Sequence, residues 1–131
     1  MHPALHSYIV EETTYSDSDV IIEEGSKGSW IYVILEGSAK VKKRTPKGTI
    51  TIDILREGEV FGEMVFLEGG KSSRSASIIA AEGQVKVGLL DTQKLIDDYE
   101  AVPSELRTLI GSLMFKLRNT TSKVCSIIVA K

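Results

Sequence analysis

The sequence predicts a mainly β fold: a roll of short strands with flanking helices, the last of them a long C-terminal helix. From Val20 to Leu90, short runs of β-branched and aromatic residues are separated by glycines, a pattern typical of an all-β barrel or roll. After Leu90 the apolar residues recur at helical spacing. We therefore expect a β-roll, a double-stranded β-helix of jelly-roll type, over about residues 13–90, and C-terminal helices over about 91–128. The length fits a single domain of residues 1–131.

Turns that contain glycine separate the predicted strands of the roll. The strands cover, in chain order, residues 20–22, 30–35, 38–42, 50–54 and 85–89. In the last three, apolar and polar residues alternate, which is the period of a half-buried strand. The pairs Glu36-Gly37, Glu57-Gly58 and Glu82-Gly83 are predicted to interrupt the β structure. Thr45–Gly48 predicts a hairpin turn, because Pro46 fixes φ and Gly48 tolerates positive φ.

Helices are predicted at both ends of the roll. The first ten residues are expected to form a short helix. Asp91 can N-cap a helix that runs to about Tyr99, and Pro103 suits the first turn of a second helix. The second helix carries a heptad seam, with Thr120 within it, that consists of Leu106, Ile110, Leu113, Leu117, Val124 and Ile127. This seam predicts a homodimer through the C-terminal helix; the alternative is that the same face packs on the roll.

The bulk composition limits the classes of function. Hydrophobic residues make up 42% of the chain, charged residues make up 26%, and the formal net charge is -2. This is ordinary for a globular domain and does not indicate a nucleic-acid partner, which would favour a basic face. No apolar run approaches the ~20 residues of a membrane span, so we expect no membrane partner. The lone Cys125 cannot form an internal disulfide, which favours a reducing, cytoplasmic compartment.

The segment Phe61–Ser77 breaks the β pattern and carries charged groups that could hold a ligand. Arg74 can hold a phosphate with its planar fork of donors, and the small Ser75 and Ala76 allow their backbone N–H groups to approach it. A short helical turn from about Glu63 would present further N–H groups to an anion. Ionised Glu63 only accepts hydrogen bonds, so it suits a sugar hydroxyl rather than the phosphate.

The same segment resembles the phosphate-binding cassette of the cyclic nucleotide-binding domain family, the type found in catabolite activator protein and in protein kinase A regulatory subunits. That cassette reads Phe-Gly-Glu-Leu-Ala-Leu and then Arg-x-Ala-Ser/Thr. The matching residues here are Phe61, Gly62, Glu63, Met64, Val65, Phe66, Arg74, Ala76 and Ser77. The resemblance covers about Thr13 to Val124 and implies a β-roll that binds cyclic AMP or cyclic GMP.

The resemblance also implies a role for each cassette residue. Its ligand-binding set is Gly62, Glu63, Met64, Arg74, Ser75, Ala76 and Ser77. Glu63 and the Gly62 backbone would take the ribose 2′-hydroxyl, and Arg74, Ser75 and the Ala76 N–H would take the cyclic phosphate. The stretch Leu67–Ser73 is longer than is common in the family, and Lys71 could substitute in part for the arginine. For Ser77, a strand position is favoured over a base contact.

Two hydroxyls, Thr120 and Thr121, interrupt the apolar face of the long helix. In the bacterial activators of the family, hydroxyl residues at the matching place contact the purine. The resemblance therefore implies that these threonines could bond an adenine edge while closing the pocket. The alternative is that they are ordinary helix-surface hydroxyls.

These observations predict a regulatory sensor rather than an enzyme. The sequence shows no activated nucleophile, no paired acid and base, and no metal-ligand spacing, so we expect no catalytic residue, metal or cofactor besides the nucleotide ligand. One alternative is a degenerate roll that no longer binds nucleotide and acts in dimerisation or protein interaction. Another is the sensor half of a transcription regulator, although no helix-turn-helix pattern follows the long helix. Truncation of Arg74 is expected to weaken nucleotide binding and leave the melting temperature of the ligand-free chain unchanged.

Overall fold

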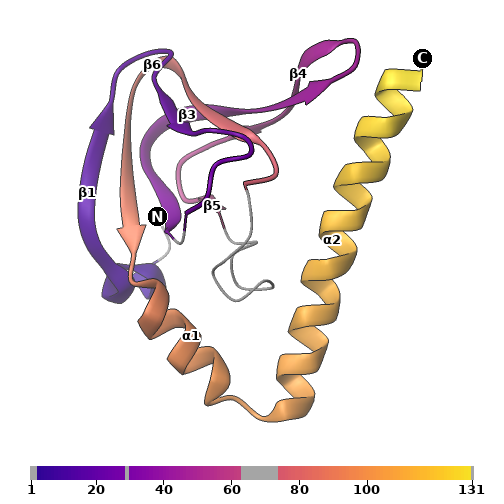
Figure 1. The fold of residues 1–131 in the computed structure, drawn as a ribbon. Helices are drawn as coiled ribbons and strands as arrows, with labels where there is room; N and C mark the ends of the chain where they lie inside the picture. Colours follow the sequence, from indigo (N-terminus) through magenta and orange to yellow (C-terminus); the bar gives the residue numbers. More distant parts are fainter. Residues whose placement is uncertain (1–2, 29, 63–73, 131) are drawn as a thin grey trace.

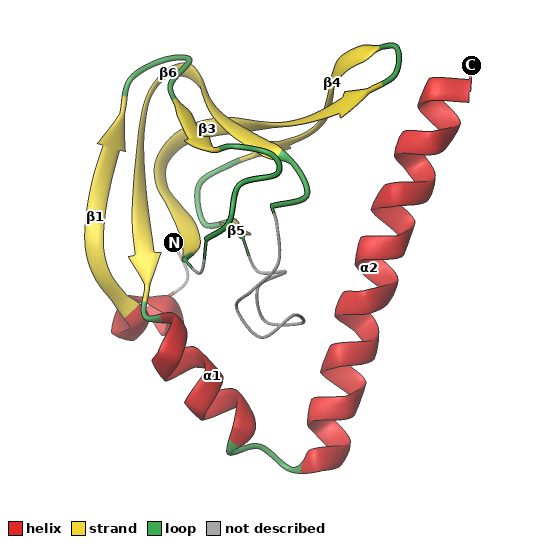
Figure 2. Ribbon diagram, in the orientation of Figure 1, coloured by secondary structure: helices red, strands yellow, loops and turns green. Residues whose placement is uncertain are grey.

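The computed structural model describes residues 3–28, 30–62 and 74–130 (Figure 1). Its elements, in chain order, are the 3-10 helix η1 (Pro3–Tyr8), β1 (Ile9–Tyr15), β2 (Val20–Ile22), β3 (Ile31–Thr45), β4 (Gly48–Leu55), β5 (Val60–Phe61), β6 (Ser77–Leu90), α1 (Thr92–Glu100) and α2 (Ser104–Ala130). The strands come first and both α-helices follow them (Figure 2). The prediction of a mainly β roll with flanking helices and a long C-terminal helix is therefore confirmed.

Strand β6 joins the two halves of the roll. The strand order is β1-β6-β3-β4, while β2 also pairs with β6 and β5 pairs with β3. On one edge β6 pairs with β3, from Leu90 opposite Ile31 to Ser77 opposite Lys42. On the other edge it pairs with β2 around Ile79 and with β1 from Val85 onward. Both edges of β6 are thus hydrogen-bonded, and all of these pairings are antiparallel.

The alternation of apolar residues in β3 divides the core between the two faces of the sheet. Inside the roll, the largest cluster of buried residues combines five strands and includes Ile34, Ala39, Leu55, Phe61, Val85 and Val87. On the opposite face, Ile31 and Val33 pack with Leu90, and η1 and α1 cover them. Each fully buried aliphatic side chain of this kind stabilises the fold by roughly 1.5–3 kcal/mol. The roll therefore has a buried apolar cluster inside and a smaller one on the opposite face, which η1 and α1 cover.

Two predicted interruptions of the β structure are wrong. Gly37 and the pair Glu82-Gly83 lie inside the continuous strands β3 and β6, where the pairing register shifts on both sides of Glu36. Gly37, Glu82 and Gly83 all have positive φ. An added Cβ at Gly37 would lie only 2.6 Å from the carbonyl oxygen of Gln84. These residues form β-bulges, which bend the paired strands without ending them.

The N-terminal segment also differs from the prediction. The expected helix over the first ten residues is the 3-10 helix η1, which ends at Tyr8, and β1 then begins at Ile9, ahead of the predicted start of the roll. The pattern of β1 is mostly exposed, so it lacks the clean alternation that identifies a strand in sequence. The hairpin turn at Thr45–Gly48 is confirmed, because Thr45 pairs with Gly48 and the Thr45 hydroxyl donates to the Gly48 carbonyl.

Helix α1 connects the roll to α2. Asp91 N-caps α1 as predicted: its Oδ1 accepts from the Lys94 N–H at 3.0 Å. The Asp91 N–H donates to the Tyr8 carbonyl at 2.7 Å, and the Tyr8 hydroxyl donates to Asp98 at 2.7 Å. This second bond raises the pKa of Tyr8. The N-cap and the last turn of α1 are thereby both joined to Tyr8 of η1.

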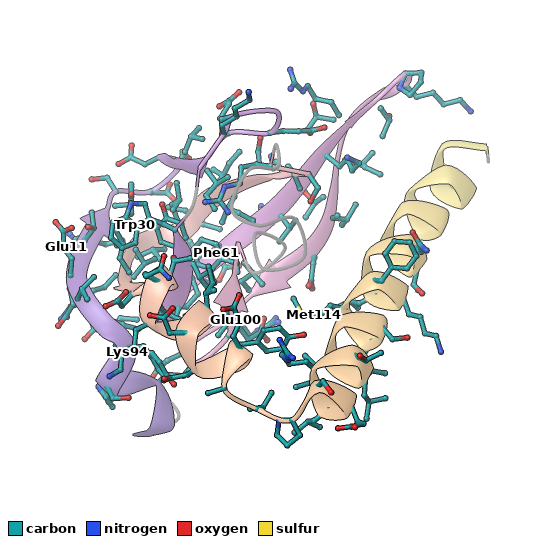
Figure 3. The ribbon with its side chains drawn as sticks, turned by 60° about the horizontal axis from the view of Figure 1, so that its bottom comes forward. Glu11, Trp30, Phe61, Lys94, Glu100 and Met114 are labelled. Atoms are coloured by element: carbon teal, nitrogen blue, oxygen red, sulfur yellow. The ribbon has the colours of Figure 1, made fainter. Side chains whose placement is uncertain are left out.

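Helix α2 begins directly after Pro103 and contacts the end of α1. The Tyr99 hydroxyl donates to the Arg107 carbonyl at 2.7 Å, and Met114 is half-buried on the side of α2 that faces Glu100 and α1 (Figure 3). Beyond this contact α2 turns back and runs in the direction of the β4 hairpin, separated from the strands in this view (Figure 1). Within the described part of the chain, no helix is long and apolar enough to cross a membrane.

Candidate functional site

Arg74 lies between β5 and β6, and the loop that follows β2 holds its backbone. The Arg74 N–H donates to the Ser26 carbonyl, and the Gly25 N–H donates to the Arg74 carbonyl, both at 2.8 Å. These reciprocal bonds resemble one rung of an antiparallel ladder. They fix the Cα of Arg74 relative to the start of the roll. The arginine that the sequence singled out therefore leaves from a defined backbone position.

The side chain of Arg74 links three segments of the roll. Its Nη2 donates to the Trp30 carbonyl at 2.8 Å, and its Nη1 donates to the Gly62 carbonyl at 3.2 Å. Trp30 precedes β3 and Gly62 follows β5. The guanidinium thus joins the residue before β3 and the residue after β5 to the segment that leads into β6. It is half-buried in this position, so its charge is screened less than that of a surface arginine.

The charge of Arg74 affects the aromatic pair beside it. Tyr32 stacks on Phe61 with 5.0 Å between ring centroids and 9° between planes. Burial raises the pKa of Tyr32 and the nearby Tyr15 adds to this, while the positive charge of Arg74 opposes it. Figure 3 shows Phe61 within the roll and Trp30 near the same end. A cationic group therefore lies beside a stacked aromatic pair that belongs to the core of the roll.

A second polar network, centred on Glu24 and Lys43, holds the loop that follows β2. Glu24 Oε1 accepts from the Arg44 N–H at 2.8 Å, and its Oε2 lies 3.5 Å from Lys43 Nζ. Lys43 Nζ also donates to the Ser75 carbonyl at 2.6 Å. The Glu24 N–H donates to Ser77 Oγ at 2.8 Å. Glu24 and Lys43 thus tie the loop after β2 to β3 and to the residues on either side of Arg74.

We expect Glu24→Ala to lower the stability of the ligand-free chain by about 1 kcal/mol, since it removes the acceptor of a backbone N–H and a charged partner. The melting temperature should fall by a few degrees, as measured by circular dichroism. Glu23→Ala is the matched control, because only the backbone carbonyl of Glu23 accepts a hydrogen bond in this turn. An equal fall in both variants would contradict a specific role for Glu24.

Comparison with known proteins identifies the family. The model of the cyclic nucleotide-binding domain matches residues 12–99. The chain belongs to this family. Its relatives include the cGMP-dependent protein kinase egl-4 of Caenorhabditis elegans, 33% identical over 74% of this chain and 13% of that protein. Another is the cAMP-dependent protein kinase type II regulatory subunit of Drosophila melanogaster, 29% identical over 76% of this chain and 29% of that protein.

Solved structures show the same fold. An EAL enzyme in its cGMP-bound form has a TM-score of 0.75 and 27% identity over 92% of this chain and 32% of that chain. The catabolite activator protein of Thermus thermophilus has a TM-score of 0.68 and 25% identity over 92% of this chain and 55% of that chain. The chain is a cyclic nucleotide-binding domain with a regulatory, sensing role. The family is regulatory rather than catalytic, although some of these relatives are enzymes as whole proteins.

The structure brings together only part of the predicted site of this cyclic nucleotide-binding domain. Gly62, with φ +82, and Arg74 are in contact, and Ser75 and Ala76 follow directly. Ser77 begins β6 and its hydroxyl accepts from Glu24, which agrees with a strand position. Glu63 and Met64, and with them the predicted helical turn and Lys71, lie outside the described residues.

The structure does not bring Thr120 of the long helix to this assembly. Thr120 is exposed on α2, and the side chain of Thr121 lies outside what the structure describes. Sequence reasoning missed Trp30 and Glu24 as parts of the site. Trp30 takes part through its backbone carbonyl, which every residue has. The amino-acid type at this position therefore gives no signal that it belongs to the site.

Proposed function

We propose that this domain binds cyclic AMP or cyclic GMP with Arg74 as the anchor of the cyclic phosphate. The observation that carries the proposal is the placement of Arg74: its backbone is fixed by Gly25 and Ser26, and its guanidinium lies beside the Tyr32–Phe61 stack. The EAL enzyme described above was solved both in a cAMP-bound and in a cGMP-bound form. Both ligands share an anionic phosphate, a ribose and a purine.

The remaining contacts follow from the family cassette. Ser75 and Ala76 would offer backbone N–H groups to the phosphate, because small side chains allow close approach. Glu63 and the Gly62 N–H would bind the ribose 2′-hydroxyl, with Met64 beside them. Thr120 and Thr121 would reach the purine only if α2 moved toward the roll. Ligand binding would then change the position of α2, which gives a physical route from ligand to output.

Titration calorimetry of the purified chain with both nucleotides tests this proposal. We expect saturable binding of at least one of them, at one site per chain. Absence of binding of both at millimolar concentration would favour the degenerate roll, in which the guanidinium has a structural role that includes its bonds to the Trp30 and Gly62 carbonyls. The affinity ratio of the two ligands gives the specificity.

The same titration with a 2′-deoxy cyclic nucleotide tests Glu63. Loss of a hydrogen bond to a charged acceptor should weaken binding roughly tenfold or more. Glu63→Gln should weaken binding of the ribonucleotide and change that of the deoxynucleotide little. Equal affinity of the ribo and deoxy ligands for the wild type would contradict this role.

We further propose that two copies pair through α2. Leu106, Leu113 and Leu117 of the predicted seam are 45–57% exposed, so these three leucines are accessible to a second copy. An exposed apolar stripe of this length is a liability in a monomer. We also propose that residues 1–131 form one domain that works in the cytoplasm, where a lone cysteine stays reduced, and that the domain itself has no catalytic activity.

A further inference from the structure

Gly28 leaves open the space that the guanidinium of Arg74 occupies. A Cβ added to Gly28 would lie 2.9 Å from Nη2, 3.2 Å from Nε and 3.5 Å from Cζ of Arg74. At 2.9 Å, the added carbon and the nitrogen Nη2 could not both stay in place, so one of the two groups would have to move. The three contacts run along one side of the guanidinium group. A residue with any side chain at this position would therefore push the whole group away from Gly28.

The backbone itself does not require glycine at this position. Gly28 is absent from the residues with positive φ, unlike Gly25 and Gly62 in the same region. At Gly62 an added Cβ would meet Arg74 Nη1 and the Trp30 carbonyl, both at 2.9 Å, but its φ of +82 would strain any substitution as well. A substitution at Gly28 should therefore displace the guanidinium without also straining the backbone, which a substitution at Gly62 would do.

The guanidinium could not easily yield to a new side chain. Its Nη2 is held by the Trp30 carbonyl at 2.8 Å and its Nη1 by the Gly62 carbonyl at 3.2 Å. The Arg74 backbone is fixed at both its N–H and its carbonyl. A displaced side chain would lose at least one carbonyl contact and present its donors to the ligand from a different place.

We propose that Gly28 is a positioning residue for Arg74: the missing side chain sets where the guanidinium lies when it meets the phosphate. This inference rests on the proposed function, because it assumes that Arg74 anchors the ligand. Gly28 itself touches no ligand atom in this scheme. It acts on affinity by fixing the position of another side chain, because hydrogen bonds to a phosphate depend on donor geometry.

Gly28→Ala tests the proposal, with binding of cyclic AMP and cyclic GMP measured by calorimetry. We expect affinity for the better ligand to fall about tenfold, the size of one weakened charge-assisted bond. The melting temperature should fall, but by less than in Arg74→Ala, because the displaced guanidinium loses at least one carbonyl contact while the rest of the side chain stays in place. The 2′-deoxy nucleotide should lose affinity by the same factor, since the ribose contacts do not involve Arg74.

A double-mutant cycle with Arg74→Ala separates positioning from a general effect on the loop. In the Arg74→Ala background, Gly28→Ala should have almost no further effect on affinity, because the clash is gone. An equal loss in both backgrounds, or unchanged affinity of Gly28→Ala, would overturn the inference. If Arg74→Ala alone binds as tightly as the wild type, the proposed function fails instead.

A readout without ligand keeps the inference testable even if binding is too weak to measure. The ¹⁵N–¹H signal of Arg74 Nε, assigned by its absence in Arg74→Ala, should shift in Gly28→Ala. The control Gly111→Ala adds the same methyl group at a site where the nearest atom is the Tyr99 hydroxyl at 3.7 Å. That control should leave the signal in place. An unmoved signal in Gly28→Ala would show that Gly28 does not position the guanidinium.

Discussion

Arg74→Ala is expected to weaken cyclic nucleotide binding at least ~30-fold, because a charge-assisted bidentate contact is worth roughly 2–3 kcal/mol. The structure changes what we expect for the chain without ligand. The guanidinium also donates to the Trp30 and Gly62 carbonyls, so its removal leaves both acceptors without this donor. The melting temperature should therefore fall by roughly 5 °C, whereas the sequence alone suggested no change.

Two further variants make this result specific. Arg56→Ala removes an exposed arginine that precedes β5 and should change neither affinity nor stability. Arg74→Lys keeps the charge but not the planar fork, so it should recover only part of the affinity. Calorimetric affinities and thermal melts of all variants provide the measurement. If Arg74→Ala bound nucleotide like the wild type, Lys71 would become the candidate anchor.

The second large effect is expected on the mass of the particle that sediments, because we propose that the chain is a dimer. Wild type should sediment at micromolar concentration with about twice the mass of one chain, and Leu113→Glu should sediment as a single chain. Two carboxylates brought together in an apolar seam would cost several kcal/mol, enough to dissociate a pair of helices. The roll should stay folded in this variant, because Leu113 is 57% exposed and belongs to neither cluster of buried residues.

Leu109→Glu is the matched control for this experiment. Leu109 lies on the same helix and is exposed to a similar extent, 55% against 57%, but it does not belong to the heptad seam. The same substitution there should leave the double mass unchanged. A wild type that stays monomeric well above micromolar concentration, with and without nucleotide, would rule out the dimer.

The parts of the fold that could be predicted from sequence depend on local physics. The hairpin at Thr45–Gly48 and the N-cap at Asp91 are encoded by residues a few positions apart. The bulges could not be predicted in this way. Glu57-Gly58 and Glu36-Gly37 are the same dipeptide with nearly the same glycine φ, 88 and 89, yet one lies in a turn and the other inside β3. What separates them is the pairing of β3 with β6, which is distant in sequence.

The candidate site likewise has a part that local sequence identifies and a part that depends on distant residues. Arg74 is identified by its own chemistry, since a planar cationic fork among small residues indicates a phosphate anchor. Its surroundings are not, because the Trp30 carbonyl comes from 44 residues away in the chain. In the sequence, Gly28 resembles an ordinary turn glycine. Its proposed role depends on the side chain of Arg74, which lies near it only in the folded chain.

The position of β6 also sets the order in which the chain can fold during synthesis. β1, β2 and β3 all pair with β6, the last strand of the roll, so none of these ladders can be completed until the residues of β6, 77–90, have left the ribosome. Before then only the local β3–β4 hairpin and the β3–β5 pair can form. Such late, long-range pairing is slow, because loop-closure entropy must be lost before the contacts form. A nascent chain of this domain therefore exposes unpaired strands until its sixth strand emerges, and it is during this interval that chaperones have most to bind.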